Sequence, residues 1–303
     1  MKQKARLVLG GGAAFGFAHI GVLDVLQSEF EITGIVGTSM GAIIGGLYAQ
    51  GKTPQEILEL ARESGSSLIF NPKQILNRPL KLSLDLIKGM HNKKKVMELL
   101  GGLIGPAQVE ELPLPFVAVA YDLVSSQTVL IDKGSLAGAM RASSSLPLLF
   151  APHDMGGHLF VDGGVEHPLP LAFADAVPGN LTIAVNVLTP VSPQARRFTN
   201  LDTEVEEMRA PEVAIQSLMQ NQGFLAIQAS LQYPPDLLID AYLPGKNMFD
   251  LLDVEEFFEH GQKAARASLE AFGQHRLNRK GAAKYLNFFS HFKKSRRPDQ
   301  KKD

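Results

Sequence analysis

Ser39 stands in a pattern of the form G-x-S-x-G, which reads Gly37-Thr38-Ser39-Met40-Gly41. This pattern is typical of a nucleophile elbow, in which a sharp turn between a strand and a helix exposes a serine hydroxyl. Gly37 and Gly41 allow the strand and the helix to approach closely, and the helix directs unpaired N–H groups towards the serine. The pattern therefore predicts acyl transfer through Ser39, and an ordinary glycine–serine turn is the alternative.

A glycine-rich loop near the amino terminus is formed by Gly10, Gly11, Gly12 and Gly16. Free backbone N–H groups in such a loop can hold the pyrophosphate of a dinucleotide or the oxyanion of a tetrahedral intermediate. Phe15 stands where the dinucleotide fingerprint G-x-G-x-x-G has its last glycine. Beside a G-x-S-x-G pattern the loop favours an oxyanion hole, and a dinucleotide-binding oxidoreductase is the rival enzyme class.

A third candidate is Asp162-Gly163-Gly164, which follows an apolar strand end. Asp-Gly pairs most often form simple turns, so this motif alone is weak evidence for catalysis. The chain also has eight histidines, and none lies in a context that marks it as a general base. A usual α/β-hydrolase places its serine deep in the chain and follows it with an acid and a histidine, which fits a serine at position 39 badly.

Strands and helices alternate around these residues. We expect strands at 5–9, 32–36, 116–120, 128–131, 158–161, 181–187 and 237–243, and helices at 15–28, 40–50, 137–140, 211–231 and 254–272, from apolar runs and helical spacing. Gly51 is expected to end the helix at 40–50. The strand–helix–strand–helix opening predicts a parallel sheet with helices on its faces, which places both loops at one sheet edge.

Composition limits the chemistry. The 303 residues are 45% hydrophobic and include no cysteine, which excludes disulfides, thiolate metal sites and a cysteine nucleophile, and a reducing compartment is plausible. No acidic cluster suggests a calcium loop, so we expect no metal and no cofactor. The uncharged runs 7–23 and 32–51 imitate a signal peptide and a membrane span, but their glycines favour buried core segments.

Two regions stand apart from the expected core. Residues 53–105 form a more polar, largely helical insertion, which we interpret as a lid or acyl-chain wall, with ordinary core helices as the alternative. Residues 276–303 hold ten basic and two acidic residues, and the segment 281–297 joins aromatic to basic side chains. That segment is expected to contact a membrane surface, and packing on the domain or a dimer contact is the alternative. We expect one domain over 1–275 and a tail over 276–303; the oligomeric state stays open, and no nucleic acid is expected.

Several ordered segments together resemble the patatin-like phospholipase family over roughly residues 5–270. Besides the three motifs above, Ala120-Tyr121-Asp122-Leu123 is similar to the family's A-T-D-L segment, and Ala142-Ser143-Ser144-Ser145-Leu146-Pro147 to its A-S-x-S-x-P block. Residues 236–250 resemble its carboxy-terminal strand-to-helix passage. Two positions depart from the family: Phe15 replaces a frequent Arg or Lys, and His167 stands where Asn is common.

The resemblance implies a three-layer α/β/α fold with a mainly parallel sheet and a Ser–Asp dyad without histidine. It implies that Ser39 is the nucleophile, Asp162 the base and the Gly10–Gly12 backbone the oxyanion hole. Gly16, Gly163 and Gly164 would support the loops. The implied activity is hydrolysis of lipid acyl esters by a phospholipase A, lysophospholipase or esterase reaction. We expect a cytoplasmic protein, with peripheral association at the inner face of the membrane as one option. A catalytically weak regulatory relative is the non-enzyme alternative.

Overall fold

The computed structural model describes residues 2–65, 97, 101–102, 104–188 and 210–273. The chain divides into two compact units, Met1–Ala265 and Arg266–Asp303. Of the second unit the described residues are 266–273, which are helical. The sheet and all candidate site residues belong to the first unit.

One eight-stranded sheet forms the centre of the first unit, with strand order β5-β6-β3-β2-β1-β7-β8 and β4 paired to β3. Its strands are β1 (Gln3–Leu9), β2 (Phe30–Thr38), β3 (Phe116–Asp122), β4 (Gln127–Ile131), β5 (His153–Met155), β6 (His158–Asp162), β7 (Leu181–Asn186) and β8 (Leu237–Asp240). The pairs β3–β2, β2–β1, β1–β7 and β7–β8 are parallel. The pairs of β3 with β4, of β3 with β6 and of β5 with β6 are antiparallel.

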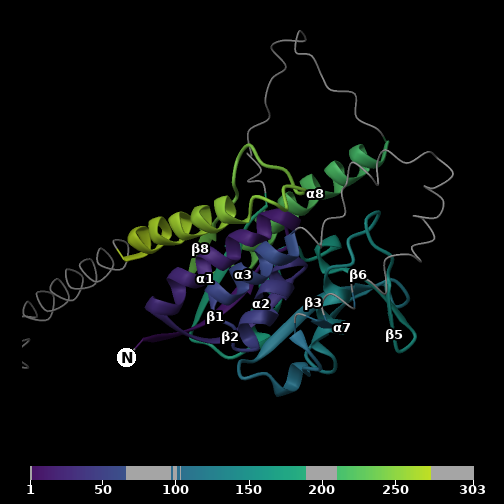
Figure 1. Cartoon of the computed structure of the whole chain (residues 1–303), viewed down its shortest axis with the longest axis horizontal. Coiled ribbons are helices and arrows are strands. Elements are labelled where there is room, and N and C mark those ends of the chain that lie inside the picture. The colour runs from purple at the N-terminus through teal and green to yellow at the C-terminus, as the bar shows by residue number, and fades with distance from the viewer. Residues whose placement is uncertain (1, 66–96, 98–100, 103, 189–209, 274–303) are drawn as a thin grey trace, which may run out of the picture. The chain divides into compact units, whose positions relative to one another are not determined.

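Helices cover the sheet and support its edge loops. They are α1 (Ala18–Glu29), α2 (Met40–Ala49), α3 (Pro54–Gly65), α7 (Leu136–Ser143) and α8 (Ala210–Gln232), with the 3-10 helices η1 (Ala13–Phe17), η2 (Val109–Glu111), η3 (Gly163–Val165) and η4 (Leu171–Ala176). Residues 254–265 are also helical. Figure 1 shows α1, α2 and α3 gathered over β1 and β2.

Successive residues of a strand point to opposite faces of the sheet, so alternate side chains of the central strands pack against the helices on one face and on the other. A Cβ added to Gly45 of α2 would meet Leu9, Ile35 and Phe116, so this face carries α2. Val8 and Ala184 point the other way and pack with Ala226 of α8 and with η4 residues. Helices thus lie on both faces, and the fold is three-layer α/β/α.

The elements expected from sequence around the site are confirmed, most with somewhat longer bounds. The first three residues of the expected helix 15–28 are the end of the 3-10 helix η1, and the expected strand 181–187 ends at Asn186. The expected strand 237–243 is shorter and ends at Asp240. Strand β5 was not expected. Gly51 follows α2 with a φ of 99°, as its expected capping position requires. Most of the expected insertion at 53–105 and the tail at 276–303 lie outside the described residues. Within the described part of the chain, no helix combines the length and apolar character needed to cross a bilayer.

Candidate active site

Ser39 lies on the sharp turn between β2 and α2, with φ 56° and ψ −124°. L-residues rarely adopt a positive φ, and such strain persists only where the surroundings enforce it. The turn is tight because glycines flank it: a Cβ on Gly37 would lie 2.6 Å from the Gly41 carbonyl oxygen, and one on Gly41 would overlap the Leu9 carbonyl. The geometry is that of a nucleophile elbow.

The glycine-rich loop lies directly beside this turn. Leu9 at the end of β1 pairs with Gly37, and a Cβ on Gly11 would lie 3.1 Å from Ser39 Cβ. The Gly10 amide donates to the Val185 carbonyl at 3.1 Å, and the Gly11 amide to the Pro168 carbonyl at 2.8 Å. Within the described residues no acceptor lies against the Gly12 or Ala13 N–H. Gly12 is thus the member of the triplet whose N–H is uncommitted.

Asp162 ends β6 and is only 1% exposed. Its Oδ1 accepts a hydrogen bond from the Gly164 amide at 2.7 Å, while Oδ2 is buried without a hydrogen bond of good geometry from any described residue. Burial raises the pKa of Asp162 to about 6, and this rise is opposed by its interactions with the Ser39 side chain and the Gly164 amide. A buried carboxylate with one unsatisfied oxygen, beside an alcohol, is suited to accept a proton.

Strand β3 lies between the two residues and sets their separation. Val119 of β3 pairs with Thr38, the neighbour of Ser39, and Ala120 pairs with Asp162. Gly163 packs so closely on β3 that a Cβ there would overlap the Val119 carbonyl oxygen. Because β6 runs antiparallel to β3, a residue at its carboxyl end faces the elbow.

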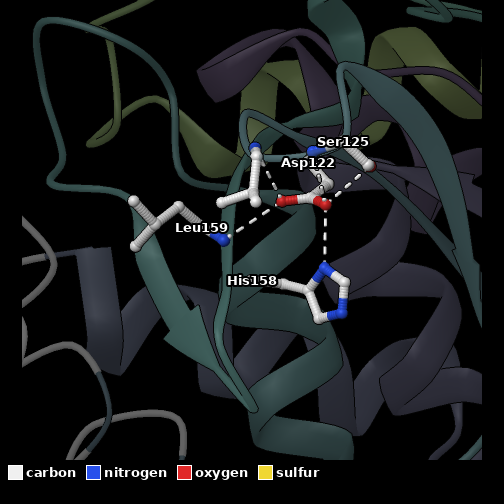
Figure 2. A network of polar contacts seen from close by, with 5 residues as sticks. Asp122, Ser125, His158 and Leu159 are labelled. Carbon is white, nitrogen blue, oxygen red and sulfur yellow. Dashed lines mark hydrogen bonds and ion pairs between the residues drawn. The ribbon is translucent and has the colours of Figure 1, made fainter.

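The start of β6 is fixed to β3 by Asp122, through the polar contacts drawn in Figure 2. The Asp122 side chain is fully buried. Its carboxylate accepts hydrogen bonds from the Ser125 hydroxyl at 2.6 Å, from His158 Nδ1 at 2.8 Å and from three backbone amides, those of Val124, Ser125 and Leu159. The Ser125 hydroxyl, then His158 and the amides, hold the pKa of Asp122 below its usual range, against the effect of burial. Asp122 is thus a structural anion that joins the β3–β4 turn to β6.

Phe15 and His167, the two departures noted in the sequence, have packing roles. Phe15 is 7% exposed, and its ring packs 5.3 Å from that of Tyr242 and 5.7 Å from that of Phe257. The His167 ring lies edge-on to Phe173 at 4.7 Å, and the His167 carbonyl accepts from the Thr38 hydroxyl at 2.9 Å. Gly16 packs against Met40, where a Cβ would overlap the methionine side chain.

Three further residues border the site and were not expected from sequence. Ser143 Oγ accepts a hydrogen bond from the Ser39 amide at 2.9 Å. His19 is fully buried, and its Nε2 bonds the Gly10 carbonyl at 2.7 Å; burial lowers its pKa to about 4, so the ring is neutral and donates. Gln222 of α8 is 3% exposed, and its Nε2 has no partner among the described residues and borders Gly164. Ser143 lies in a recognisable sequence block, whereas no pattern marks His19 or Gln222.

A family model described as patatin-like phospholipase matches residues 7–175. An uncharacterised NTE family protein of Mycobacterium tuberculosis is 36% identical over 185 residues, which cover 61% of this chain and 49% of that protein. The mouse patatin-like phospholipase domain-containing protein 6 is 34% identical over 188 residues, covering 60% of this chain and 13% of that protein. The chain thus spans about half the length of the mycobacterial relative.

Two solved structures are similar at low sequence identity. VipD from Legionella pneumophila aligns with a TM-score of 0.40 and 13% identity over 88% of this chain and 67% of that chain. The type III effector protein ExoU of Pseudomonas aeruginosa aligns with a TM-score of 0.37 and 15% identity over 90% of this chain and 53% of that chain.

Proposed function

The chain belongs to the patatin-like phospholipase family, and on this premise we propose that it is a serine acyl-ester hydrolase of lipids with a Ser39–Asp162 dyad. The observation that carries the proposal is the burial of Asp162 beside Ser39, with a pKa raised to about 6. A carboxylate of ordinary pKa is a weak base towards an alcohol, and a desolvated one is stronger. The strained elbow holds the alcohol in place without a histidine.

In the first half-reaction, Ser39 Oγ attacks the ester carbonyl carbon while Asp162 Oδ2 accepts the hydroxyl proton. A new C–O bond forms, and the carbonyl π electrons move to the oxygen. When this tetrahedral intermediate collapses, the bond to the alcohol breaks, and the alcohol oxygen takes the proton from Asp162. The acyl group is left on Ser39.

The negative oxygen of the intermediate needs hydrogen-bond donors. We assign them to the uncommitted N–H groups of Gly12 and Ala13, together with the amino end of α2, whose first amide belongs to Met40. Gly10 and Gly11 contribute by fixing the loop through their own hydrogen bonds. Removal of one oxyanion donor typically costs about 3–4 kcal/mol of transition-state stabilisation.

In the second half-reaction, water replaces the alcohol. Asp162 takes one proton from the water as its oxygen attacks the acyl carbon, and the collapse of the intermediate returns this proton to Ser39 Oγ. A free fatty acid leaves, and the enzyme is restored. The chain's own residues supply every proton transfer in this cycle.

Apolar side chains near the end of β3 support an acyl-chain substrate. Leu123 is 48% exposed, Val124 61% and Leu159 39%. The Leu123 amide donates to the Leu159 carbonyl at 2.9 Å, which holds the end of β3 against β6. Exposed apolar groups that gather on one surface commonly mark sites that bind apolar partners. Leu123 and Val124 follow β3 beyond the level of Ser39, and Leu159 belongs to β6, so that apolar side chains of two paired strands are available to an acyl chain.

Fluorophosphonate labelling followed by assays on p-nitrophenyl esters and phospholipids tests the proposal. We expect an adduct on Ser39 and ester turnover in the wild type, and the loss of turnover in Ser39→Ala and in Asp162→Asn with folding intact. Ser28→Ala is a matched control, because the Ser28 hydroxyl bonds only groups of its own helix end. A folded wild type without an adduct favours the silent regulatory alternative, and near-wild-type turnover in either dyad variant refutes the mechanism.

A further inference from the structure

The short segment from Ser143 to Ser145, at the end of α7, touches the backbone of both proposed catalytic residues. Ser143 Oγ accepts from the Ser39 amide at 2.9 Å and donates to the Val119 carbonyl of β3 at 2.6 Å. The Ser145 carbonyl accepts from the Asp162 amide at 3.0 Å. Ser143 and Ser145 are both fully buried. Two residues 123 positions apart in sequence are therefore connected through three consecutive ones.

The Ser143 hydroxyl binds a residue whose backbone is strained. The Ser39 amide begins a residue with φ 56°, and a conformation of this kind is kept only where neighbouring groups enforce it. Without the hydroxyl, both the Ser39 N–H and the Val119 carbonyl lose a partner in a buried environment, which favours relaxation of the turn. The relaxation would move Ser39 Oγ relative to Asp162.

A buried arginine makes this segment rigid. Arg141 is 1% exposed; it donates to Ser145 Oγ and, through Nη2, to the Ala151 carbonyl at 2.9 Å, and its guanidinium lies 5.4 Å from the Phe150 ring centre. The Ser145 hydroxyl in turn donates to the Arg141 carbonyl at 2.6 Å. No acidic side chain in the described ranges forms an ion pair with Arg141. Its hydrogen bonds therefore hold the turn after α7 in one conformation.

We infer that Ser143 is a positioning residue of the dyad, and that the Ser143 hydroxyl and the Ser145 carbonyl together set the spacing between Ser39 and Asp162. The inference rests on the proposed function, because it assigns Ser143 a role in that reaction. It gives a physical reason for the A-S-x-S-x-P block: the first serine holds the nucleophile turn, and the second holds the segment that binds the base.

The decisive comparison is Ser143→Ala against Ser144→Ala. The Ser144 hydroxyl donates to the Met140 carbonyl at 2.7 Å and contacts neither catalytic residue, so its removal is a matched control from the same segment. A displacement of about 1 Å at a catalytic group can lower the rate about 100-fold. We expect Ser143→Ala to lose about 100-fold in kcat and in the rate of fluorophosphonate labelling, with KM within about threefold of wild type. Ser144→Ala should keep kcat within about twofold.

Hydrogen exchange of the Ser39 amide supplies a readout that does not need activity. Exchange should be faster in Ser143→Ala than in wild type or Ser144→Ala, because the acceptor of that amide is gone. A merely structural role would lower the unfolding temperature of Ser143→Ala and leave kcat unchanged at 20 °C. If Ser143→Ala does not fold, Ser143→Cys, which is close in size but a weak hydrogen-bonding partner, carries the same comparison.

The outcomes separate the two ideas. An active wild type with an unchanged kcat and an unchanged Ser39 exchange rate in the Ser143 variant overturns the inference and leaves the proposed function standing. A wild type that neither reacts with the probe nor turns over esters refutes the proposed function. In that case, faster exchange of the Ser39 amide in the Ser143 variant still supports the inference that Ser143 holds the turn, and an unchanged exchange rate refutes that inference.

Discussion

At the scale of single residues, the site depends on a carboxylate held in an environment that opposes its charge. Asp162 gains one hydrogen bond from the Gly164 amide, but desolvation outweighs it and raises the pKa to about 6. Function and stability therefore make opposite demands on this side chain. The proposed reaction needs the ionised form, while the fold is more stable with the neutral form.

Activity should rise with pH through the Asp162 titration. Because the ionised carboxylate is the proposed base, kcat/KM should increase with a midpoint at about pH 6 and level off above it. The measurement is the pH–rate profile with a soluble ester from pH 4.5 to 8.5, alongside the labelling rate by fluorophosphonate. A profile that is flat from pH 5 to 8 would contradict a base with this raised pKa.

Asp162→Asn should be inactive and yet at least as stable as wild type at pH 8. The folded pKa lies above the ordinary value of 3.8, so ionisation destabilises the fold at high pH, and this penalty shrinks as pH falls from the folded pKa towards 3.8. The amide keeps an oxygen for the Gly164 N–H and carries no charge. We expect a gain of up to about 3 kcal/mol in the free energy of unfolding at pH 8 that shrinks by pH 4. Urea unfolding at both pH values measures it, and a clear loss at pH 8 would contradict it.

At the scale of elements, β6 must be anchored at both ends to deliver Asp162. Asp122 binds its beginning, and Gly163 packs on β3 at its end. The anchor is a carboxylate whose pKa is held low by the Ser125 hydroxyl first. Its contribution is therefore present above the ordinary carboxyl pKa and is lost as pH falls towards the lower folded value.

Asp122→Asn should lower the unfolding temperature at pH 7. The side-chain NH2 group of asparagine would face N–H and O–H groups whose hydrogen bonds the carboxylate now accepts. The difference from wild type should begin to shrink as pH falls below about 4, because the unfolded chain then takes up a proton at this position while the folded carboxylate stays ionised. Thermal unfolding followed by circular dichroism from pH 3 to 7 checks both points. Asp154→Asn, a substitution at an exposed position on the neighbouring β5, is the control. An equal unfolding temperature for Asp122→Asn and wild type at pH 7 would contradict this role.

Close packing of α2 on β1 gives a second prediction for an element. Gly41→Ala would push a methyl group into the Leu9 carbonyl, whereas a Cβ on Gly138 of α7 meets nothing nearer than 3.5 Å. We expect Gly41→Ala to abolish ester turnover and to reduce the soluble yield, and Gly138→Ala to behave like wild type. Turnover near the wild-type level in soluble Gly41→Ala would show that the elbow tolerates this displacement.

The sequence is informative where local patterns decide the structure. Apolar runs and glycines locate β1, β2 and α2, and G-x-S-x-G locates the turn at Ser39. The three-residue β5 has no apolar signal, since its segment His153–Met155 is mostly polar. The antiparallel course of β6 depends on distant pairing with β3. The hydroxyl contact of Ser143 and the burial of Gln222 follow from tertiary packing that no local spacing encodes.

At the scale of the whole molecule, the charge of the chain is unevenly distributed. Residues 276–303 carry ten basic and two acidic residues, although the whole chain has a net charge of −1. Basic and aromatic side chains together favour contact with anionic lipid headgroups. We propose that the segment 281–297 brings the enzyme to a membrane surface, where its substrate lies.

Removal of the residues after Gln274 should reduce flotation of the protein with liposomes that contain anionic lipid, and added salt should weaken flotation of the full chain. Turnover of a soluble ester should be unchanged, because the dyad belongs to the first unit. Neutral liposomes serve as the control. Equal flotation of the full and shortened chains on anionic liposomes would dismiss this role for the tail.

The positive φ of Ser39 also affects how the stabilities of variants at this position should be compared. The positive φ is sterically unfavourable for any residue with a Cβ, so Ser39→Ala keeps the same backbone strain as the wild type. Ser39→Gly removes this strain, because glycine adopts a positive φ without steric cost. We expect the free energy of unfolding, measured with urea, to be about 1 kcal/mol higher for Ser39→Gly than for Ser39→Ala, although neither variant should turn over esters. The same Ala-to-Gly exchange at Ala42, inside α2, should have the opposite sign. The residue proposed as the nucleophile therefore lies at a position where any side chain, its own included, destabilises the local backbone conformation.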